Sequence, residues 1–441
     1  MNSAIKAKLS VMMFLEYVIW GAWLPLLGLY LADYLKFQAS EIEWSFNAFA
    51  LASITGMFIG GQLVDRYFAQ ERFLAFSHLI GGVAMLALPY QEKFWPFFAL
   101  MLLHCFFYVP TMAVTNSIAF ANIKDAQKDF GVIRLWGTIG WIAAAWPFVF
   151  ILIDWASVPS MAEAGGFVAW MGKALGTLKT GPAMKLALAS TFTVSGVASL
   201  VLAAFSLLLP HTPPPKSAPT FAPIEALKLL KVPAILILFV VTFLDSLVHN
   251  QYFYWTSRYL PKIGLASNWI APAMSIGQIA EILTMAALGV VLKRLGWRTT
   301  MIIGLLGHVV RFGIYAIGDQ STLWLVILSN IVHGLAYAFF FATVYIFVDE
   351  NFPKDVRTSA QSLFNLLILG VGPLVSNFLS ARLSTFFLPD EAAAPAAVLA
   401  AYHKIFLVPL GLGLLGTAIF VAFFHPQAQE PVPEEVPVLV N

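Results

Sequence analysis

The chain has 441 residues, of which 60% are hydrophobic and 11% are charged, and its formal net charge is +2. A soluble domain has an apolar share nearer half and a charged share of about a quarter, so this composition excludes an ordinary soluble protein and indicates a polytopic membrane protein. The lysines and arginines are scattered through short loops rather than gathered in a basic patch, which argues against nucleic acid as a partner. The single cysteine, Cys105, excludes an internal disulfide and a cysteine metal cluster.

Twelve stretches are apolar and close to the roughly 20 residues that a helix needs to cross a bilayer. We expect these spans at residues 9–32, 44–64, 73–90, 94–118, 131–153, 184–209, 231–256, 268–292, 299–317, 321–348, 358–386 and 401–424. The first is too long for a signal-peptide core and has no small-residue cleavage site, so we expect it to stay as a helix. The predicted fold class is an all-α integral membrane protein.

The charges of the loops predict the orientation. With both termini in the cytoplasm, fifteen Lys and Arg residues fall on the cytoplasmic side and nine on the other, with Arg311 inside a span. Cytoplasmic loops carry an excess of Lys and Arg, so we expect both termini to be cytoplasmic. Residues 156–182 then form a long outer connection.

The proline-rich segment 210–230 divides the twelve spans into six and six. Its proline density disfavours helix and predicts an extended linker. Gly61, Asp65 and Arg66 follow the second span, and a related string beginning at Gly289, 228 positions later, follows the eighth. Such a repeat predicts two pseudo-symmetric six-helix halves. The expected organisation is a bundle at 1–209, a linker at 210–230, a bundle at 231–424 and a cytoplasmic tail at 425–441.

Three spans contain carboxylates, namely Glu16, Asp245 and Glu281. Ser275, Gln278 and Glu281 are spaced three apart and form a polar stripe on one helix face, and Glu16 lies in the first span. An ionisable group at membrane depth costs several kcal/mol unless it is paired, protonated or wetted, so such groups usually line substrate or proton paths. Glu281 is the first candidate for carrying a proton and Glu16 is its rival. The alternative for Glu281 is a static pair with an arginine that locks two helices.

Three spans carry polar or aromatic side chains that suit a binding site. Arg134, Thr138 and Trp141 form one stripe and Asn330, His333 and Tyr337 another, while His249, Asn250 and Gln251 form a polar cluster of consecutive residues. A flat ring can stack on an aromatic side chain while donors and acceptors fix its polar edges. The alternatives are that Arg134 marks a helix end, that Trp141 packs or faces lipid, that the amides lie in the outer interface, and that the histidines pack in the core.

Enzyme motifs are missing from the sequence. There is no phosphate-binding glycine loop with lysine, no zinc helix motif and no convincing pair of nucleophile and base. We therefore expect no enzyme activity, no cofactor and no metal site, and movement driven by a gradient rather than by ATP.

Several strings resemble a known family. Twelve spans, a central linker and the string from Gly61 to Arg66 resemble the major facilitator superfamily, and longer strings look like its bacterial nucleoside:proton symporter family. They are Phe14-Leu-Glu16-Tyr-Val-Ile-Trp20-Gly21-Ala-Trp23-Leu, Tyr108-Val-Pro110-Thr111, Ile133-Arg134-Leu-Trp136-Gly137-Thr138-Ile-Gly140-Trp141, Ser275-Ile-Gly-Gln278-Ile-Ala-Glu281 and Val356-Arg357-Thr-Ser-Ala360-Gln361. They lie in both halves, so the resemblance covers nearly the whole chain.

The resemblance implies a proton-coupled importer of nucleosides that works by alternating access in the bacterial inner membrane. The substrate-binding residues that we expect are Arg134, Thr138, Trp141, Asn250, Gln251, Gln278, Glu281, His333 and Tyr337. Glu281 or Glu16 would couple protons, and the loop with Gly61, Asp65, Arg66 and Arg72 would contribute to the cytoplasmic gate. Asp245 is a further ionisable partner that cannot be tied to a family position.

Ala338 departs from the family pattern. Well-described members of the family carry an aspartate there that contacts substrate, so the alanine leaves other functions open. One is a symporter of another polar solute, such as a sugar or a nucleobase. Another, from a different class, is a membrane receptor or scaffold that keeps the fold without transporting anything.

Overall fold

The computed structural model describes residues 3–123, 126–213, 229–351, 354–389 and 393–425, and their side chains except those of 57–67, 126–128, 229 and 354–359. Helices account for most of the described chain, and within it one isolated backbone bridge joins Ile153 to Leu178. Most of the predicted linker and tail lies outside the described residues.

The helices of the first half cover the first six predicted spans. They are α1 (Ser3–Leu29) with a π-helical turn η1 (Tyr30–Tyr34), α2 (Ala39–Tyr67), α3 (Gln70–Ala87) with η2 (Leu88–Tyr90), α4 (Phe94–Asn122), α5 (Ala126–Ala145) with α6 (Phe148–Ile151), and α9 (Gly181–Ser206). Helix α1 packs against α5 and α9, α3 packs against α4 and α9, and α2 packs against α4.

The helices of the second half cover the other six predicted spans. They are η3 (Leu229–Lys231), α11 (Pro233–Tyr259), η4 (Leu260–Ile263), η5 (Ser267–Trp269), α12 (Ile270–Tyr315), α13 (Leu323–Leu328), α14 (Ile331–Ala336), η6 (Tyr337–Ala342), α15 (Thr343–Asn351), α16 (Lys354–Asn365), η7 (Leu366–Val371), α17 (Gly372–Phe387) and α18 (Pro395–Phe423). Here α12 packs against α14 and α18, and α11 packs against α17 and α18.

Ten helical segments of the described chain are long and apolar enough to cross a membrane. One of them contains α12, which runs through two predicted spans and breaks at Gly296, whose φ of 72° and ψ of 172° are not helical. Helix α2, which covers the predicted span 44–64, is not among the ten. Every predicted span coincides with helix, and the count of twelve separate crossings stays a prediction.

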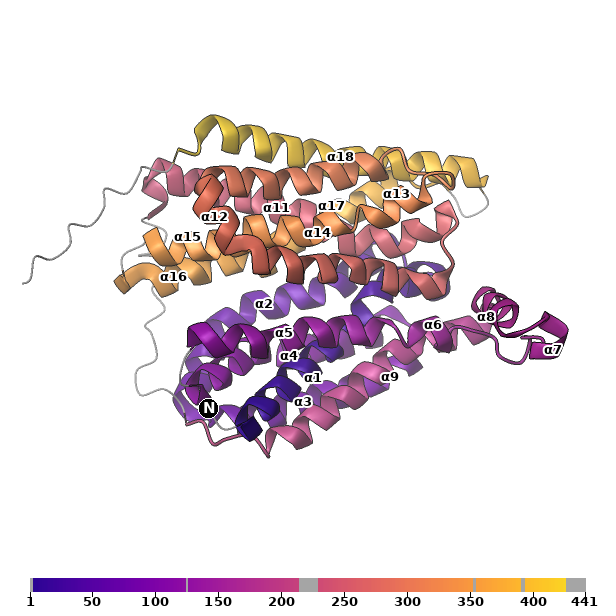
Figure 1. The fold of residues 1–441 in the computed structure, drawn as a ribbon, viewed down its shortest axis with the longest axis horizontal. Coiled ribbons are helices and arrows are strands. Elements are labelled where there is room, and N and C mark those ends of the chain that lie inside the picture. Colours follow the sequence, from indigo (N-terminus) through magenta and orange to yellow (C-terminus); the bar gives the residue numbers. More distant parts are fainter. Residues whose placement is uncertain (1–2, 124–125, 214–228, 352–353, 390–392, 426–441) are drawn as a thin grey trace, which may run out of the picture.

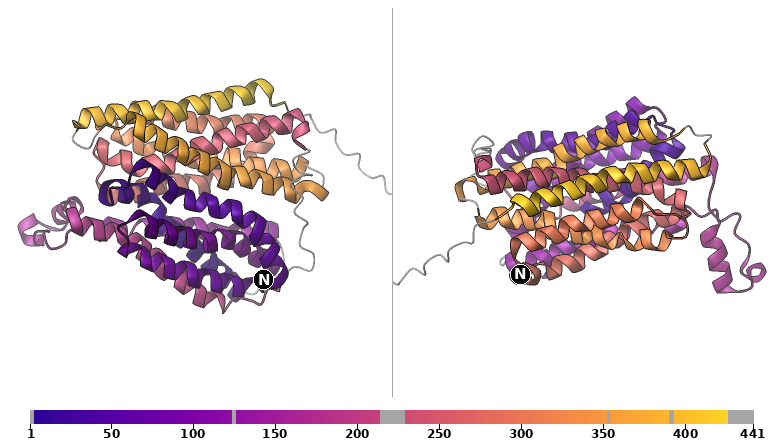
Figure 2. Two further views of the ribbon diagram at one scale, coloured as in Figure 1. Left: turned by 180° about the vertical axis from the view of Figure 1, so that it is seen from behind. Right: turned by 90° about the horizontal axis from the view of Figure 1, so that it is seen from above.

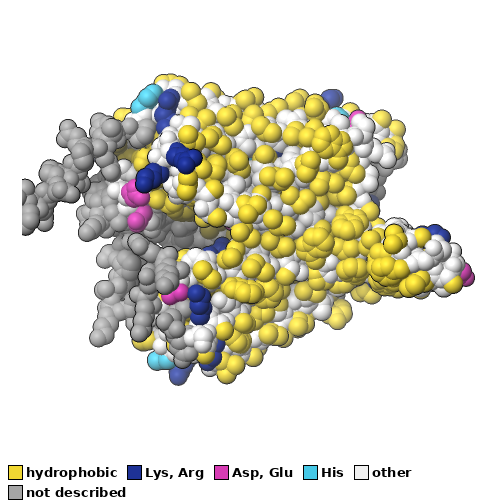
Figure 3. All heavy atoms as spheres, in the orientation of Figure 1, with side chains coloured by type: hydrophobic (Ala, Val, Ile, Leu, Met, Phe, Trp, Pro, Cys, Tyr) yellow, Lys and Arg dark blue, Asp and Glu magenta, His cyan; other side chains and the backbone are white. Residues whose placement is uncertain are grey.

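The two halves lie side by side as two helical bundles (Figures 1 and 2). They meet where α1, α2 and α5 of the first half contact α11, α12, η7 and α17 of the second. On the face shown in Figure 3, hydrophobic side chains cover most of both bundles, while most of the visible Lys and Arg lie at the left end. Large apolar side chains on the outside, such as Trp95 at 72% and Leu283 at 68% exposed, suit a surface that faces lipid rather than water.

The connection 156–182 forms a projection beyond the end of the bundle that lies opposite the N-terminus (Figures 1 and 2). It contains α7 (Met161–Ala164) and α8 (Phe167–Gly176), joined by Gly165 and Gly166 at positive φ, which glycine adopts without steric cost. The side-chain amide of Asn268 donates to the backbone oxygens of Leu175 and Val149, at 3.1 and 3.3 Å. The projection is thereby attached to the second half.

The predicted gating loop is not a loop. Helix α2 continues to Tyr67, so Gly61, Asp65 and Arg66 lie in its last turns, and the connection to α3 is only Phe68 and Ala69. Because only two residues connect α2 to α3, the residues before them belong to helix α2 and not to a loop. Arg72 lies exposed in the first turn of α3, while the side chains of Gly61, Asp65 and Arg66 are outside the described part.

Glycines set the distance between α1 and α5. A Cβ atom at Gly140 would overlap the backbone of Phe14, and one at Gly21 would lie 2.7 Å from the backbone oxygen of Trp141. Only glycine lets two backbones approach this closely. The glycines of the string from Arg134 to Trp141 therefore place α5 against α1, with its polar residues beside the interface of the two halves.

Candidate substrate-binding cavity

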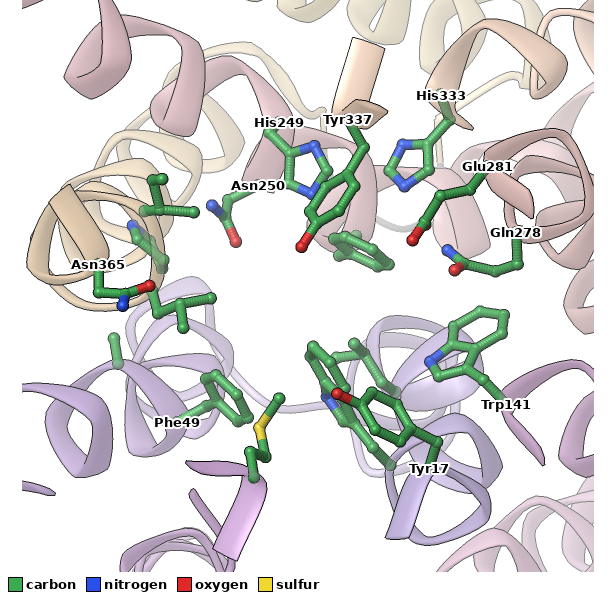
Figure 4. A pocket seen from close by; sticks show the side chains of 18 of the residues that line it. Tyr17, Phe49, Trp141, His249, Asn250, Gln278, Glu281, His333, Tyr337 and Asn365 are labelled. Carbon is green, nitrogen blue, oxygen red and sulfur yellow. The ribbon is translucent and has the colours of Figure 1, made fainter. Parts of the chain in front are cut away.

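A cavity of about 380 Å³ lies between the two halves, a size that suits a small organic molecule. The predicted residues that line it are Arg134, Thr138, Trp141, Asn250, Gln278, Glu281, His333 and Tyr337. They come from both halves and face one another across the cavity, as Figure 4 shows for the residues it labels. Eight of the nine predicted substrate contacts are thus brought together.

The wall formed by α1 and α5 combines a cation with aromatic rings. The guanidinium carbon of Arg134 lies 4.2 Å from the ring centre of Tyr17, within the range of a cation–π interaction. Thr138 and Trp141 lie one and two turns further along α5, and Trp141 is only 4% exposed. Arg134 therefore belongs to the cavity rather than marking a helix end at water.

An aromatic pair extends this wall. The rings of Trp20 and Phe49 are stacked, with centroids 5.2 Å apart and planes at 7°, and both side chains line the cavity. With Trp141 they provide flat apolar surface next to polar groups. A planar heterocycle can stack on such a surface while its edges form hydrogen bonds.

The opposite wall is formed by α12. Gln278 and Glu281 lie one turn apart and both point into the cavity, across from Trp141 (Figure 4). A Cβ atom at Gly334 would overlap the backbone nitrogen of Glu281, so this glycine lets α14 lie directly against α12. Among the described residues the Glu281 carboxylate has no hydrogen-bond partner, and its oxygens are free to accept bonds from a substrate.

His333 and Tyr337 complete this wall beside His249 of α11 (Figure 4). Tyr337 begins the π-helical turn η6, a kind of turn that is often found at functional sites. The rings of His249 and His333 are stacked at 4.8 Å. Ala338 is fully buried and packs with Leu288 and Phe339, so the position of the missing aspartate is filled by apolar packing.

Gln251 is the one predicted contact that does not line the cavity. It is fully buried, its amide nitrogen donates to the backbone oxygen and the hydroxyl of Ser376, and its oxygen accepts from Trp255 at 2.7 Å. Neighbouring residues of a helix point about 100° apart, so Gln251 points about 200° away from His249, which with Asn250 lines the cavity. Its side chain instead bonds α11 to α17.

Glu16 also lies outside the cavity lining. Its carboxylate accepts from the hydroxyl of Thr111 at 2.7 Å and pairs with His78 Nε2 at 2.9 Å, and the side chain is fully buried. These contacts join α1 to α3 and α4. Glu281 is therefore the predicted proton carrier that reaches the cavity.

Several lining residues were not predicted from the sequence. Polar or aromatic examples are Tyr17, Phe49, Asn116, Phe253, Tyr345, Asn365 and Asn377. Asn116 is informative because its buried side-chain oxygen has no partner among the described residues. The signal for the asparagines was present, since an amide within an apolar span is unusual, but it does not tell which helix face they occupy.

A family model described as "Nucleoside H+ symporter" matches residues 3–164 and 165–429 of the chain. The chain is 34% identical to the putative nucleoside transporter YegT of Escherichia coli over 84% of its own length and 82% of that protein. It is 30% identical to the xanthosine permease of the same organism, over 95% of each chain.

Solved structures agree in fold. The crystal structure of the nucleoside transporter NupG matches with a TM-score of 0.79 and 23% identity, covering 97% of this chain and all of that one. A D-xylose–proton symporter matches with a TM-score of 0.67 and 14% identity over 95% and 97% of the two chains. These likenesses establish the two-bundle transporter fold.

Proposed function

The chain belongs to the nucleoside H+ symporter family, and from that premise we propose that it imports nucleosides together with protons by alternating access. The observation that supports this most is the composition of the cavity. Stacked aromatic rings lie on one wall, and on the other lie the amide of Gln278 and the carboxylate of Glu281, which has no hydrogen-bond partner in the described part of the chain. The flat base of a nucleoside can stack on the aromatic rings, and its ribose hydroxyls can donate hydrogen bonds to the carboxylate.

We propose a division of roles within the cavity. Trp141 and the stacked Trp20 provide surfaces for the base, while Arg134 and Gln278 provide hydrogen-bond donors for its acceptor atoms. Glu281 accepts from ribose hydroxyls. The remaining predicted contacts, Thr138, Asn250, His333 and Tyr337, supply further polar groups around the same cavity.

Glu281 is also the proposed coupling carboxylate. A carboxylate that is both the substrate acceptor and a proton site links the two ligands, because its protonation changes the charge of the cavity that the substrate meets. Its place on the cavity wall lets it exchange protons with whichever side wets the cavity. Substrate and proton then move together.

The membrane arrangement is part of the proposal. We propose the bacterial inner membrane with both termini in the cytoplasm and the projection of α7 and α8 outside, as the distribution of Lys and Arg in the loops favours. Asp65, Arg66 and Arg72 then lie at the cytoplasmic ends of α2 and α3 and form part of the gate. A C-terminal fluorescent-protein fusion should fluoresce, and a C-terminal alkaline phosphatase fusion should be inactive; the reverse pattern would refute this orientation.

Uptake in proteoliposomes tests the function. With an imposed pH gradient, inside alkaline, radiolabelled uridine or adenosine should accumulate saturably, and a protonophore should abolish accumulation. The Glu281→Gln protein should lose accumulation by more than tenfold yet keep nucleoside exchange. Glu92→Gln is the matched control, because Glu92 is an exposed carboxylate paired with Lys185 far from the cavity lining, and it should transport normally.

Two results would overturn the proposal. Folded wild-type protein that accumulates no nucleoside from a panel, but accumulates a sugar or a nucleobase, would replace the substrate class. Full accumulation by Glu281→Gln would remove Glu281 from the coupling role while leaving the substrate class intact.

A further inference from the structure

A second buried polar cluster lies behind the cavity in the second half. Arg311 of α12 is fully buried. Its Nη1 lies 2.5 Å from Nδ1 of His333, and its Nη2 lies 3.0 Å from Nδ1 of His308. Nε2 of His308 lies 3.6 Å from Oδ2 of Asp245 on α11. Asp245, His308, Arg311 and His333 thus form a continuous chain, which we call the arginine chain.

The hydrogen bonds fix the protons of both imidazoles. A guanidinium has only donors, so Nδ1 of His308 and Nδ1 of His333 must each accept. An imidazole that accepts at Nδ1 is neutral and carries its hydrogen on Nε2. His308 therefore presents Nε2–H to Asp245, and His333 keeps Nε2–H for the cavity that it lines.

The charge of Arg311 then needs Asp245. A guanidinium stays charged in proteins, and a buried charge is costly unless it is balanced. The two histidines that it touches are neutral, so the balancing charge is the Asp245 carboxylate, one imidazole away. That carboxylate is held loosely, because neither its Oδ2 nor Nε2 of His308 has a hydrogen-bond partner among the described residues.

The first half contains the counterpart of this pair. Asp245 and Glu16 are 229 positions apart, and His308 and His78 are 230 apart, close to the 228 of the glycine repeat. Each half thus has a buried carboxylate–histidine pair on its first and third spans. In the first half the two side chains are within hydrogen-bond distance, with 2.9 Å between His78 Nε2 and Glu16 Oε2.

The Glu16–His78 pair shares a proton, whereas the Asp245–His308 pair does not have this additional proton. Ser199 donates its hydroxyl to the backbone oxygen of His78 and so accepts from His78 Nδ1. With that nitrogen donating, the 2.9 Å contact between His78 Nε2 and Glu16 requires one proton between them. The first pair is therefore already protonated. In the second, Arg311 supplies the positive charge instead, so Asp245 has an open place for a proton.

The cluster communicates with the cavity at two points. His333 is bonded to Arg311 and lines the cavity, and His249 lies one turn from Asp245 on α11 and also lines it. Nδ1 of His249 is buried without a partner among the described residues. His249 is thus the polar side chain placed between Asp245 and the cavity, where a proton from a wetted cavity would pass.

We propose that Asp245 is a second proton-binding site, linked to the substrate cavity through His308, Arg311 and His333; this inference rests on the proposed function. A hydronium ion in the wetted cavity transfers one proton to a carboxylate oxygen of Asp245: one O–H bond of the hydronium breaks, one O–H bond forms on Asp245, and a water molecule is left. The positive charge of Arg311 is then unbalanced and withdraws electron density from His333. Its Nε2–H becomes a stronger donor to an acceptor on the nucleoside, so proton and substrate favour each other's binding.

The titratable groups around Asp245 and the arginine chain come from the helices packed there. They are His249 on α11, His308 and Arg311 on α12, His333 on α14, Tyr315 beside Arg311 and Tyr337 beside His249. Tyr252, also on α11, lies 4.3 Å from the guanidinium carbon of Arg311 and shields it. Tyr402 of α18 approaches α11 at Trp255 and Arg258, further along the helix.

Binding measurements on the purified full chain test the proposal. Radiolabelled adenosine or uridine is bound at a series of pH values, and the wild-type Kd should rise by about tenfold from acidic to alkaline pH. Glu281→Gln should keep part of this pH dependence, about fivefold. The double variant, which carries Asp245→Asn as well as Glu281→Gln, should have a Kd that no longer changes with pH and stays close to the value of Glu281→Gln at acidic pH. Its Tm should match that of Glu281→Gln. Asp245→Glu in place of Asp245→Asn should restore the pH dependence of the Kd.

Different results would refute the second proton site and the proposed function. A Kd of Glu281→Gln that no longer depends on pH, or an unchanged dependence in the double variant, would overturn the second site. A wild type that binds no nucleoside would refute the proposed function instead. Should Asp245→Asn not fold, proton uptake on nucleoside binding in weakly buffered solution decides: Glu281→Gln should still take up protons, and no uptake would overturn the proposal.

Discussion

Asn377 donates a hydrogen bond from its side-chain amide to the side-chain oxygen of Asn47, 2.9 Å away. The bond joins α17 of the second half to α2 of the first, and both side chains are buried. Nearer the end where α7 and α8 project, Lys262 pairs with Asp33 at 3.6 Å, and Asn268 bonds the projection. The halves are thus held together on that side, and alternating access requires these contacts to separate.

Removing the Asn47–Asn377 bond should therefore shift the halves apart at that end. One buried hydrogen bond contributes about 1 kcal/mol, so Asn47→Ala should raise the open population about fivefold. With the buried Cys105 replaced by serine, a cysteine at Leu24, which lines the cavity and is 8% exposed, reports the opening. A membrane-impermeant maleimide added outside should label it faster in the variant.

The double variant is the control for this prediction. Asn47→Ala and Asn377→Ala remove the same bond, so the double variant should be labelled no faster than either single variant. If the two substitutions raise the labelling rate independently, so that their effects multiply in the double variant, the Asn47–Asn377 bond is not what holds the halves together. An unchanged labelling rate in both single variants and the double variant would contradict the prediction.

The Arg134–Tyr17 contact should matter for substrate affinity. A cation–π interaction shielded from water is worth up to about 2 kcal/mol, and Arg134→Lys keeps the charge but loses the flat guanidinium. We expect KM for nucleoside to rise about tenfold with a smaller change in maximal rate. Tyr17→Phe keeps the ring and should transport nearly normally, whereas Tyr17→Leu should resemble Arg134→Lys. Equal activity of the two Tyr17 variants would show that the ring does not position the arginine.

The sequence predicted where helices form better than where they end. Hydropathy located a helix at every predicted span because burying backbone in lipid leaves few alternatives to helix. It did not predict that α2 continues to Tyr67, or that α12 runs on to a break at Gly296. These ends depend on the geometry of the turn and not on apolar content. The π-helical turns, including the one that begins at Tyr337, left no signal in the hydropathy.

The site was predictable to the extent that helical spacing fixes a face. Arg134, Thr138 and Trp141 follow one stripe, so one correct residue implied the others. Choosing between the adjacent Asn250 and Gln251 requires the rotation of α11, which depends on contacts such as that of Gln251 with Ser376. In the same way, hydropathy cannot tell that Glu16 points away from the cavity and Tyr17 toward it.

Gly140 should be required for the packing of α5 on α1. A Cβ atom there would overlap the backbone of Phe14, which cannot move without shifting the helix. Overpacking of this kind costs about 1–3 kcal/mol, so Gly140→Ala should lower the Tm and raise KM, because Thr138 and Trp141 would move with α5. Gly131→Ala in the same helix is the matched control, since a Cβ atom added there would have no described atom within 4 Å outside its own helix backbone and chain neighbours. Equal Tm values for the two variants would contradict this account.

Glu16→Gln should affect stability rather than coupling. The two carboxylate oxygens take bonds from Thr111 and His78, whereas the amide of glutamine has only one acceptor oxygen and a nitrogen that only donates, so it cannot accept from both. A buried polar group left unsatisfied costs about 1–3 kcal/mol, so the Tm should fall. Because Glu16 does not line the cavity, nucleoside accumulation per folded protein should match the wild type. Thr111→Val, which removes one donor, should lower the Tm similarly. An unchanged Tm with lost accumulation would instead assign proton coupling to Glu16.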